Sequence, residues 1–145
     1  WDDDDYSDPD RLGWQVANTP AGQASILRYE IHCNLLTGDA FTNDGRSICC
    51  GGFPGTMLWP STVKCRFPAT GMREDTAFVM SLSTECGVIV LQNNPTLYTR
   101  FFTGFNTWPK RHVMHKKPGA RDLNAVEQFH TCQVWHHYTQ ERSDA

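Results

Sequence analysis

The clearest hydrophobic pattern of the chain lies in residues 25–36, S-I-L-R-Y-E-I-H-C-N-L-L. Over residues 27–35 apolar residues occupy every second position, and Arg28, Glu30, His32 and Asn34 lie between them. A period of two places successive side chains on opposite faces of a strand. We therefore expect a half-buried strand whose inward face includes the first cysteine, Cys33, and whose polar face meets solvent.

Four further segments have strand-like apolar runs. Residues 61–67 and 96–105 alternate, the second through Leu97, Thr99, Phe101, Thr103 and Phe105, so we read Phe101 and Phe105 as core. Residues 77–83 and 86–92 are apolar nearly throughout, as central strands are. Short turns separate these segments, whereas parallel neighbours need crossovers of about a dozen residues or more. The pattern predicts antiparallel pairing.

The remaining segments are punctuated or ambiguous. Residues 1–24 are acidic and contain Pro9, Gly13 and Pro20, which predicts an extended arm. Turn residues fill 37–60, which predicts loop, and 122–129 have a helical pattern, whereas 130–138 fit a helix or a strand equally well. The expected fold class is α+β: one domain over 25–145 with a small antiparallel sheet of four to five strands and one or two helices.

Six cysteines are the main clue to the compartment, and they are Cys33, Cys49, Cys50, Cys65, Cys86 and Cys132. Their number is even and no C-x-x-C spacing occurs, which favours disulfides over a dithiol motif or a zinc ribbon. We expect three disulfides and a secreted, extracellular protein. A bridge within the doublet Cys49-Cys50 is disfavoured because adjacent Cα atoms are too close, so each should bond to a distant cysteine. The connectivity stays open.

The distribution of charge points to a possible binding face. Residues 64–121 carry nine Lys and Arg against three acids, although the whole chain has a net charge of −3. Aromatic residues lie among these cations, and aromatics with Arg are enriched at protein–protein interfaces. Nine cations over so long a segment are far fewer than a nucleic-acid-binding arm carries, so a nucleic-acid partner is not expected. The candidate binding residues are Arg100, Phe102, Trp108, Lys110, Arg111, Lys116 and Lys117.

The sequence contains no diagnostic catalytic motif, but one enzymatic alternative stays open. Glu30 and His32 share a strand face, and with His112 they could supply the acid–base groups of a small secreted ribonuclease. No metal site and no cofactor are expected, since the His and Cys residues lack chelating pairs apart from His112-x-x-His115. No apolar run is long enough to span a membrane. Trp108 also allows a carbohydrate-binding module.

The acidic N-terminal arm, the cysteine doublet and the Pro/Gly-rich loops together resemble small secreted fungal effectors. Within that class the chain is similar to the LARS group of avirulence effectors, whose short W-R-(F/L/V)-R-(R/K) segment has its nearest counterpart in Y-T-R-F-F, residues 98–102. The resemblance implies a role for Arg100 and a protein that acts in the host apoplast without catalysis. It further implies that a host protein is bound and that host resistance receptors recognise the effector.

Overall fold

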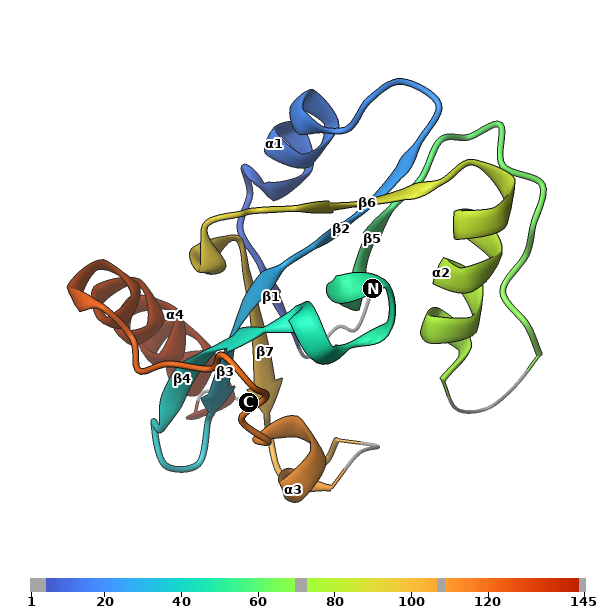
Figure 1. The fold of residues 1–145 in the computed structure, drawn as a ribbon. Helices are drawn as coiled ribbons and strands as arrows, with labels where there is room; N and C mark the ends of the chain where they lie inside the picture. The colour runs from blue at the N-terminus through green and yellow to red at the C-terminus, as the bar shows by residue number, and fades with distance from the viewer. Residues whose placement is uncertain (1–4, 70–72, 107–108, 144–145) are drawn as a thin grey trace. The chain divides into compact units, whose positions relative to one another are not determined.

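The computed structural model describes residues 5–69, 73–106 and 109–143. Within these ranges the chain forms seven short strands and four α-helices (Figure 1). The strands belong to two separate small sheets, so the expected mixture of helices and strands is confirmed, whereas the single sheet is not.

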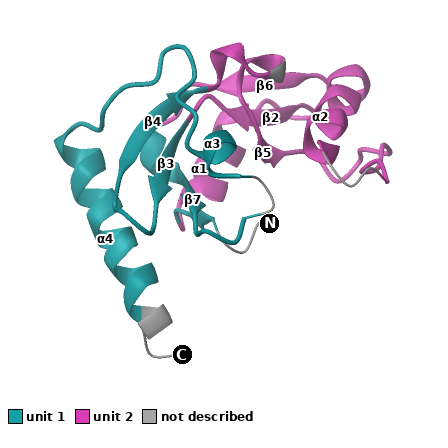
Figure 2. Cartoon of the chain, turned by 90° about the horizontal axis from the view of Figure 1, so that it is seen from below, with its two compact units in different colours: residues 1–8, 30–44, 94–145 teal, residues 9–29, 45–93 magenta. Residues whose placement is uncertain are grey.

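The chain divides into two compact units, and each unit contains one of the sheets (Figure 2). Unit 1 comprises residues 1–8, 30–44 and 94–145. Unit 2 comprises residues 9–29 and 45–93. Because the two units alternate along the sequence, each of them depends on contacts between segments far apart in the chain. The prediction of one domain over 25–145 stays a prediction.

Unit 1 is built on a four-stranded sheet in the order β1-β7-β3-β4. Its strands are β1 (Tyr6–Ser7), β3 (Tyr29–Asn34), β4 (Ala40–Asp44) and β7 (Tyr98–Phe102). Strand β7 runs antiparallel to β1 but parallel to β3. The connection from β3 to β4 takes only residues 35–39, which is long enough for an antiparallel neighbour but too short for a parallel one.

One face of this sheet is apolar and is covered by helix α4 (Ala125–Ser143). Cys33 of β3 and Phe101 of β7 are partners in the strand register, and both are fully buried against Val134 of the helix. Tyr138 adds its ring to that of Phe101 at a centroid distance of 4.8 Å. The predicted inward direction of Cys33 is therefore confirmed, and so is the predicted core position of Phe101.

Unit 2 contains a three-stranded sheet in the order β5-β2-β6. Its elements are α1 (Arg11–Asn18), β2 (Ala24–Leu27), β5 (Phe53–Leu58), α2 (Glu74–Glu85) and β6 (Val88–Leu91). Strand β2 is antiparallel to β5 and parallel to β6. The strands that become parallel neighbours are separated by other elements in the sequence, which is why the prediction of an antiparallel sheet is wrong for both units.

The two helices of unit 2 cover opposite faces of its sheet. Ala24 packs with Phe78 and Leu82 of α2, whereas the next residue, Ser25, accepts a hydrogen bond of 3.1 Å from Gln15 of α1. Adjacent residues of a strand point to opposite faces, so α1 and α2 cannot share one. Helix α1 contacts the sheet through polar side chains and leaves apolar ones such as Val16 exposed.

The long apolar run of residues 25–36 is extended, as predicted, but it forms two strands that belong to different sheets. At the division the amides of Arg28 and Tyr29 both donate to Asn93 Oδ1, each at 2.9 Å, and Asn93 Nδ2 donates to the Tyr29 carbonyl at 2.8 Å. The Asn93 side chain thus adds hydrogen bonds to the backbone at the point where one strand ends and the next begins.

The prediction of a strand over 77–83 is wrong, because these residues lie inside helix α2. Phe78, Val79 and Leu82 are the buried residues of that helix, at the i, i+1, i+4 spacing that gathers side chains on one helical face. Glu74 and Asp75 occupy the first turn, where carboxylates interact favourably with the helix dipole. A continuously apolar run does not distinguish a buried helix from a strand.

The prediction of a strand over 61–67 is also wrong, since this segment has no regular structure. The amides of Lys64 and Cys65 donate to the Glu85 carboxylate, at 2.5 and 2.8 Å, instead of to a neighbouring strand. Val63 joins the buried cluster on α2, and the Phe67 ring stacks on Phe78 at 4.1 Å. The alternating apolar residues of this segment therefore pack against a helix and do not form one face of a strand.

Two other segments contain more regular secondary structure than was predicted. Helix α1 lies in the predicted extended arm of residues 1–24, and strands β4 and β5 lie in the predicted loop of 37–60. The predicted helix over 122–129 is confirmed as the start of α4, which continues through the ambiguous residues 130–138. Strands β6 and β7 confirm the predictions over 86–92 and 96–105, although Phe105, expected in the core, is 92% exposed.

The structure contains no support for the predicted stabilisation by three disulfides. The structure records no disulfide among the cysteine side chains that it describes, and these are Cys33, Cys50, Cys65, Cys86 and Cys132. The side chain of Cys49 lies outside the described part of the structure.

Replacement of Gly52 by alanine should destabilise unit 2. A β-carbon at this position would lie 2.7 Å from the Leu27 carbonyl oxygen and 2.8 Å from Ile26 Cγ1, so the loop or strand β2 must shift. We expect Gly52→Ala to lower the free energy of unfolding by about 1–3 kcal/mol in urea denaturation. In Gly55→Ala the new methyl meets no atom within 4 Å, and the change should stay below about 0.5 kcal/mol. Equal effects would contradict the close approach.

Candidate functional site

The face of the unit 1 sheet opposite α4 carries an unusual concentration of polar side chains. In the register of β3 and β7, His32 lies beside Arg100, and both point away from the face that holds Cys33 and Phe101. Glu30 belongs to the same face because it lies two residues before His32. We call this surface the polar face. We predicted that this face meets solvent, but the exposed fraction is only 2% for Glu30 and 4% for His32.

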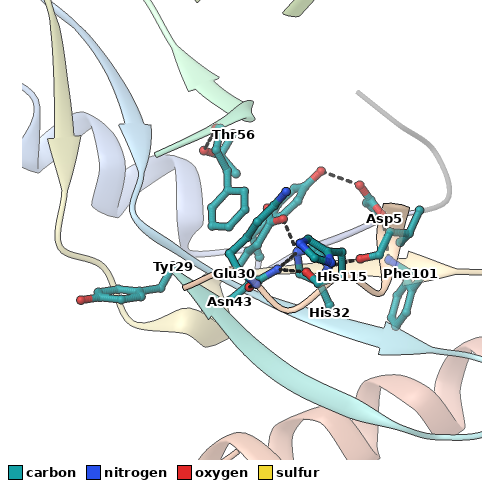
Figure 3. Close-up of polar contacts among 12 residues, drawn as sticks. Asp5, Tyr29, Glu30, His32, Asn43, Thr56, Phe101 and His115 are labelled. Atoms are coloured by element: carbon teal, nitrogen blue, oxygen red, sulfur yellow. Dashed lines mark hydrogen bonds and ion pairs between the residues drawn. The ribbon is translucent and has the colours of Figure 1, made fainter. Parts of the chain in front are cut away.

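His32 is held on both sides of its imidazole ring (Figure 3). Nδ1 contacts the carbonyl oxygen of Val113, which can only accept a hydrogen bond, so Nδ1 carries a hydrogen. Nε2 lies 2.6 Å from Glu30 Oε1, and the ring stacks on Phe41 of β4 at a centroid distance of 5.4 Å. The position of the imidazole is therefore determined by groups from three separate parts of unit 1.

Asn43 of β4 completes this buried network. Its Nδ2 donates to the His115 carbonyl at 3.0 Å and lies 3.3 Å from His32 Nε2, while its Oδ1 accepts from the Lys117 amide at 2.8 Å. Asn43 is fully buried. One amide side chain thus satisfies two part-buried backbone groups of an irregular segment. Without Asn43 these two groups would lose those hydrogen bonds.

The segment that this network holds is basic. We call residues 110–117 the basic segment, which comprises helix α3 (Lys110–Val113) and the four residues after it. Val113 is 1% exposed and fixes the segment to unit 1, whereas the charged and titratable side chains are exposed or half-buried. These side chains are Lys110, Arg111, His112, His115, Lys116 and Lys117. Buried polar groups on the sheet thus position a row of cations at the surface.

One cation of the basic segment also covers the edge of the network. The Lys116 ammonium lies 5.3 Å from the centroid of the Phe41 ring, on which His32 stacks, and it is 3.3 Å from the exposed Asp122 carboxylate. A cation over an aromatic face gains electrostatic energy from the ring quadrupole.

Asp5 forms a second polar cluster, beside strand β7. The Phe101 amide donates to Oδ1 at 2.9 Å and the Tyr98 hydroxyl donates to Oδ2 at 2.8 Å (Figure 3). Burial raises the pKa of Asp5 to about 7, although the Arg100 guanidinium and these two hydrogen bonds each lower it. The charge of Glu30 raises it further. The charges of Asp5 and of the polar-face residues Glu30 and Arg100 therefore influence one another.

The residues predicted for binding fall into three groups. Lys110, Arg111, Lys116 and Lys117 lie together on the basic segment, as their closeness in sequence suggested. Arg100 and Phe102 are half-buried on β7, with Arg100 close enough to Asp5 to act on its charge. Trp108 lies outside the described residues.

Of the three residues predicted for catalysis, two are buried and one is exposed. Glu30 and His32 are in contact, as the ribonuclease alternative requires, whereas His112 is exposed on α3. Asp5 and Asn43 were missed, because neither has a local sequence signal: the Asp5 carboxylate binds groups 93 and 96 residues away, and the Asn43 side chain contacts groups 11, 72 and 74 residues away.

No group of three or more His, Cys, Asp and Glu side chains in the described ranges is arranged to hold a metal ion. Among the helices that the structure describes, none combines the length and the apolar character needed to cross a membrane.

Comparison with known proteins identifies no relative: no protein-family model matches the chain, and neither does any curated protein or solved structure. The function is therefore inferred from the geometry of the chain itself.

The buried Asp5 carboxyl should make stability depend on pH. Since its pKa is about 7 when folded and about 4 in an unfolded chain, the folded state binds the extra proton between these values. Stability is highest below about pH 4 with respect to this group and falls as the pH rises to about 7, by on the order of 2–4 kcal/mol. Asp5→Asn should remove this fall in urea denaturation series at several pH values.

The matched control for this experiment is Asp122→Asn, which alters a carboxylate whose side chain is 93% exposed. It should leave the pH dependence of the wild-type protein unchanged. A slope that persists in Asp5→Asn would show that another group is responsible.

Loss of the Asn43 side chain should loosen the basic segment. Asn43→Ala leaves the His115 carbonyl and the Lys117 amide without their partner, at a cost of about 1–3 kcal/mol. The measurement is hydrogen exchange, in which the Lys117 amide should exchange faster than in the wild type. Asn18→Ala, which removes an exposed side chain of unit 2, should leave that amide protected. An unchanged Lys117 amide in Asn43→Ala would contradict the role of this network.

Proposed function

We propose that the protein is a secreted effector of a plant-pathogenic fungus that binds an acidic surface of a host protein through its basic segment. It acts in the host apoplast without catalysis, and host resistance receptors detect it there. The supporting observation is the way in which Glu30, His32 and Asn43 fix the backbone of residues 113–117. A preformed cationic surface loses little conformational entropy when it binds.

The chemistry of the basic segment fits a protein partner of opposite charge. Five of its side chains are exposed Lys, Arg or His, and they are Lys110, Arg111, His112, His115 and Lys116. Such a row steers an acidic partner into contact and favours correct orientation, mainly through the association rate. Phe105, which is 92% exposed, lies shortly before the segment in the sequence and adds apolar contact area of the kind found at interfaces.

The ribonuclease alternative keeps one supporting observation, the contact between Glu30 and His32 with Arg100 beside it in the strand register. An acid–base histidine must reach the proton that it transfers. Here Nδ1 is engaged by a backbone carbonyl and Nε2 by Glu30, and the ring is 4% exposed. These contacts suit a structural histidine better than a catalytic one.

Secretion and three disulfides remain part of the proposal. Their support is the even number of cysteines without C-x-x-C spacing, which is typical of chains that fold in an oxidising compartment.

Removing cations from the basic segment should weaken binding to the host partner. We expect Lys110→Ala combined with Arg111→Ala to reduce affinity on the order of tenfold, mainly through slower association, and the wild-type affinity to fall with added salt. The assay captures proteins from host tissue on the immobilised chain and then measures association kinetics with the captured protein at two salt concentrations.

The control variant, Arg46→Ala combined with Lys64→Ala, removes the same charge from exposed positions of unit 2. It should bind as the wild type does. Equal losses in both double variants would mean that net charge acts rather than the basic segment. Infiltration of the purified protein into a panel of host genotypes should give a response in some of them, and a uniform lack of response would contradict the effector role.

The purified protein should not hydrolyse RNA. If RNA were degraded by the wild type but not by His32→Ala or Glu30→Ala, with both variants still folded by circular dichroism, the ribonuclease function would replace the proposed one.

A further inference from the structure

Cys65 lies in an irregular segment that is fastened to helix α2 on both sides. Two residues before it, Val63 joins the buried cluster of Phe78 and Leu82. Two residues after it, Phe67 stacks on the Phe78 ring at a centroid distance of 4.1 Å. The segment has no strand partner, so these contacts determine where the cysteine lies.

The contact nearest to Cys65 comes from the last residue of α2. Both carboxylate oxygens of Glu85 accept backbone hydrogen bonds, from the Lys64 amide at 2.5 Å and from the Cys65 amide at 2.8 Å. The Arg66 guanidinium binds the carbonyl oxygens of residues 63, 64 and 65 at 3.3, 2.7 and 3.0 Å, which closes the turn around the cysteine. Cys65 is therefore held at the carboxyl end of α2.

Cys86 follows Glu85 directly and is the C-cap residue of α2. Its thiol lies 3.4 Å from the Leu82 carbonyl oxygen and therefore against the last turn of the helix. Cys65 and Cys86 pack as half-buried residues on the same apolar cluster, which contains Ala24, Val63, Phe78 and Leu82. Desolvation raises the pKa of the Cys65 thiol, and the neighbouring Glu85 and Cys86 raise it further.

The other described thiol of unit 2 is placed elsewhere. Cys50 contacts Met80, with a distance of 3.7 Å between the two sulfur atoms. Met80 precedes Cys86 by six residues, which corresponds to about 9 Å along a helix axis. This contact of Cys50 is thus with the middle of α2, whereas the Glu85 contact of Cys65 is at the end of the helix.

We propose that Cys65 and Cys86 are partners in a disulfide that links the irregular segment of residues 61–67 to the end of α2. The bond would close a covalent loop of residues 65–86, which contains the whole of helix α2. It would preserve the Glu85 contacts, since both cysteines flank them. The pairing requires only an oxidising solution and no host partner, so it can hold or fail independently of the proposed binding function.

The chemistry is thiol–disulfide exchange with a low-molecular-weight disulfide such as oxidised glutathione. The thiolate of one cysteine attacks a sulfur atom of the reagent, which forms a mixed disulfide and releases one thiolate of the reagent. The second cysteine, as its thiolate, then attacks the mixed disulfide, forms the Cys65–Cys86 bond and releases the second thiolate. Each cysteine loses one proton to the solvent and each released thiolate takes one up, so both cysteines are oxidised and the reagent is reduced to two thiols.

Mass mapping of the bridges tests this pairing. The wild-type chain is equilibrated in a glutathione redox buffer, remaining thiols are alkylated, and the protein is digested with trypsin without reduction. Trypsin can cut after Lys64, Arg66 and Arg73, so Cys65 and Cys86 separate into different peptides unless a bridge joins them. The expected product is residues 65–66 linked to residues 74–100.

Two variants keep the result interpretable. Cys132→Ser alters an exposed cysteine of unit 1 and should still give the linked peptides. Cys65→Ser combined with Cys86→Ser should lose them, and it should also lose the upward shift in the urea midpoint that oxidation of this pair produces in the wild type. Recovery of Cys65 or Cys86 mainly in bridges to other cysteines would overturn the proposal, as would alkylation of both in the oxidising buffer.

Discussion

The arrangement of unit 1 depends on one buried interaction, the placement of the His32 imidazole between the Glu30 carboxyl and the Val113 carbonyl. Polar groups of this kind are costly to bury unless each has a partner. Asn43 supplies further partners to the backbone of the same segment. The two faces of the sheet consequently differ in kind: one is apolar and covered by α4, and the other is polar and covered by the basic segment.

The difference between the two faces of the sheet explains how a small unit presents a charged surface on a segment with little regular structure of its own. Helix α3 has only four residues, and such a short helix is not stable alone in water. The network on the polar face replaces the missing local stability with contacts to β3 and β4, and Val113 adds an apolar anchor. Stability and proposed binding are thus linked, because the same buried side chains that attach the basic segment to the sheet also position its cations.

Local patterns in the sequence predict part of this structure. Alternation identified β3 and β7 and the inward direction of Cys33, because a strand with one apolar face has a period of two. The same rule failed for Glu30 and His32, since a segment about 80 residues away covers their face. Residues 77–83 were misread because a buried helix and a buried strand are equally apolar. The contacts of Asn43 and Asp5 join separate segments of the chain, and a local sequence pattern does not show such contacts.

The central claim is that His32 is a structural residue, and the nuclear magnetic resonance spectrum of its imidazole nitrogens tests this most directly. We predict that Nδ1 carries a hydrogen that exchanges slowly with solvent, because it is buried against the Val113 carbonyl. The ring signals should not change when a short RNA is added. A rapidly exchanging Nδ1 hydrogen, or ring signals that shift with RNA, would contradict the structural role and place His32 in a reactive site.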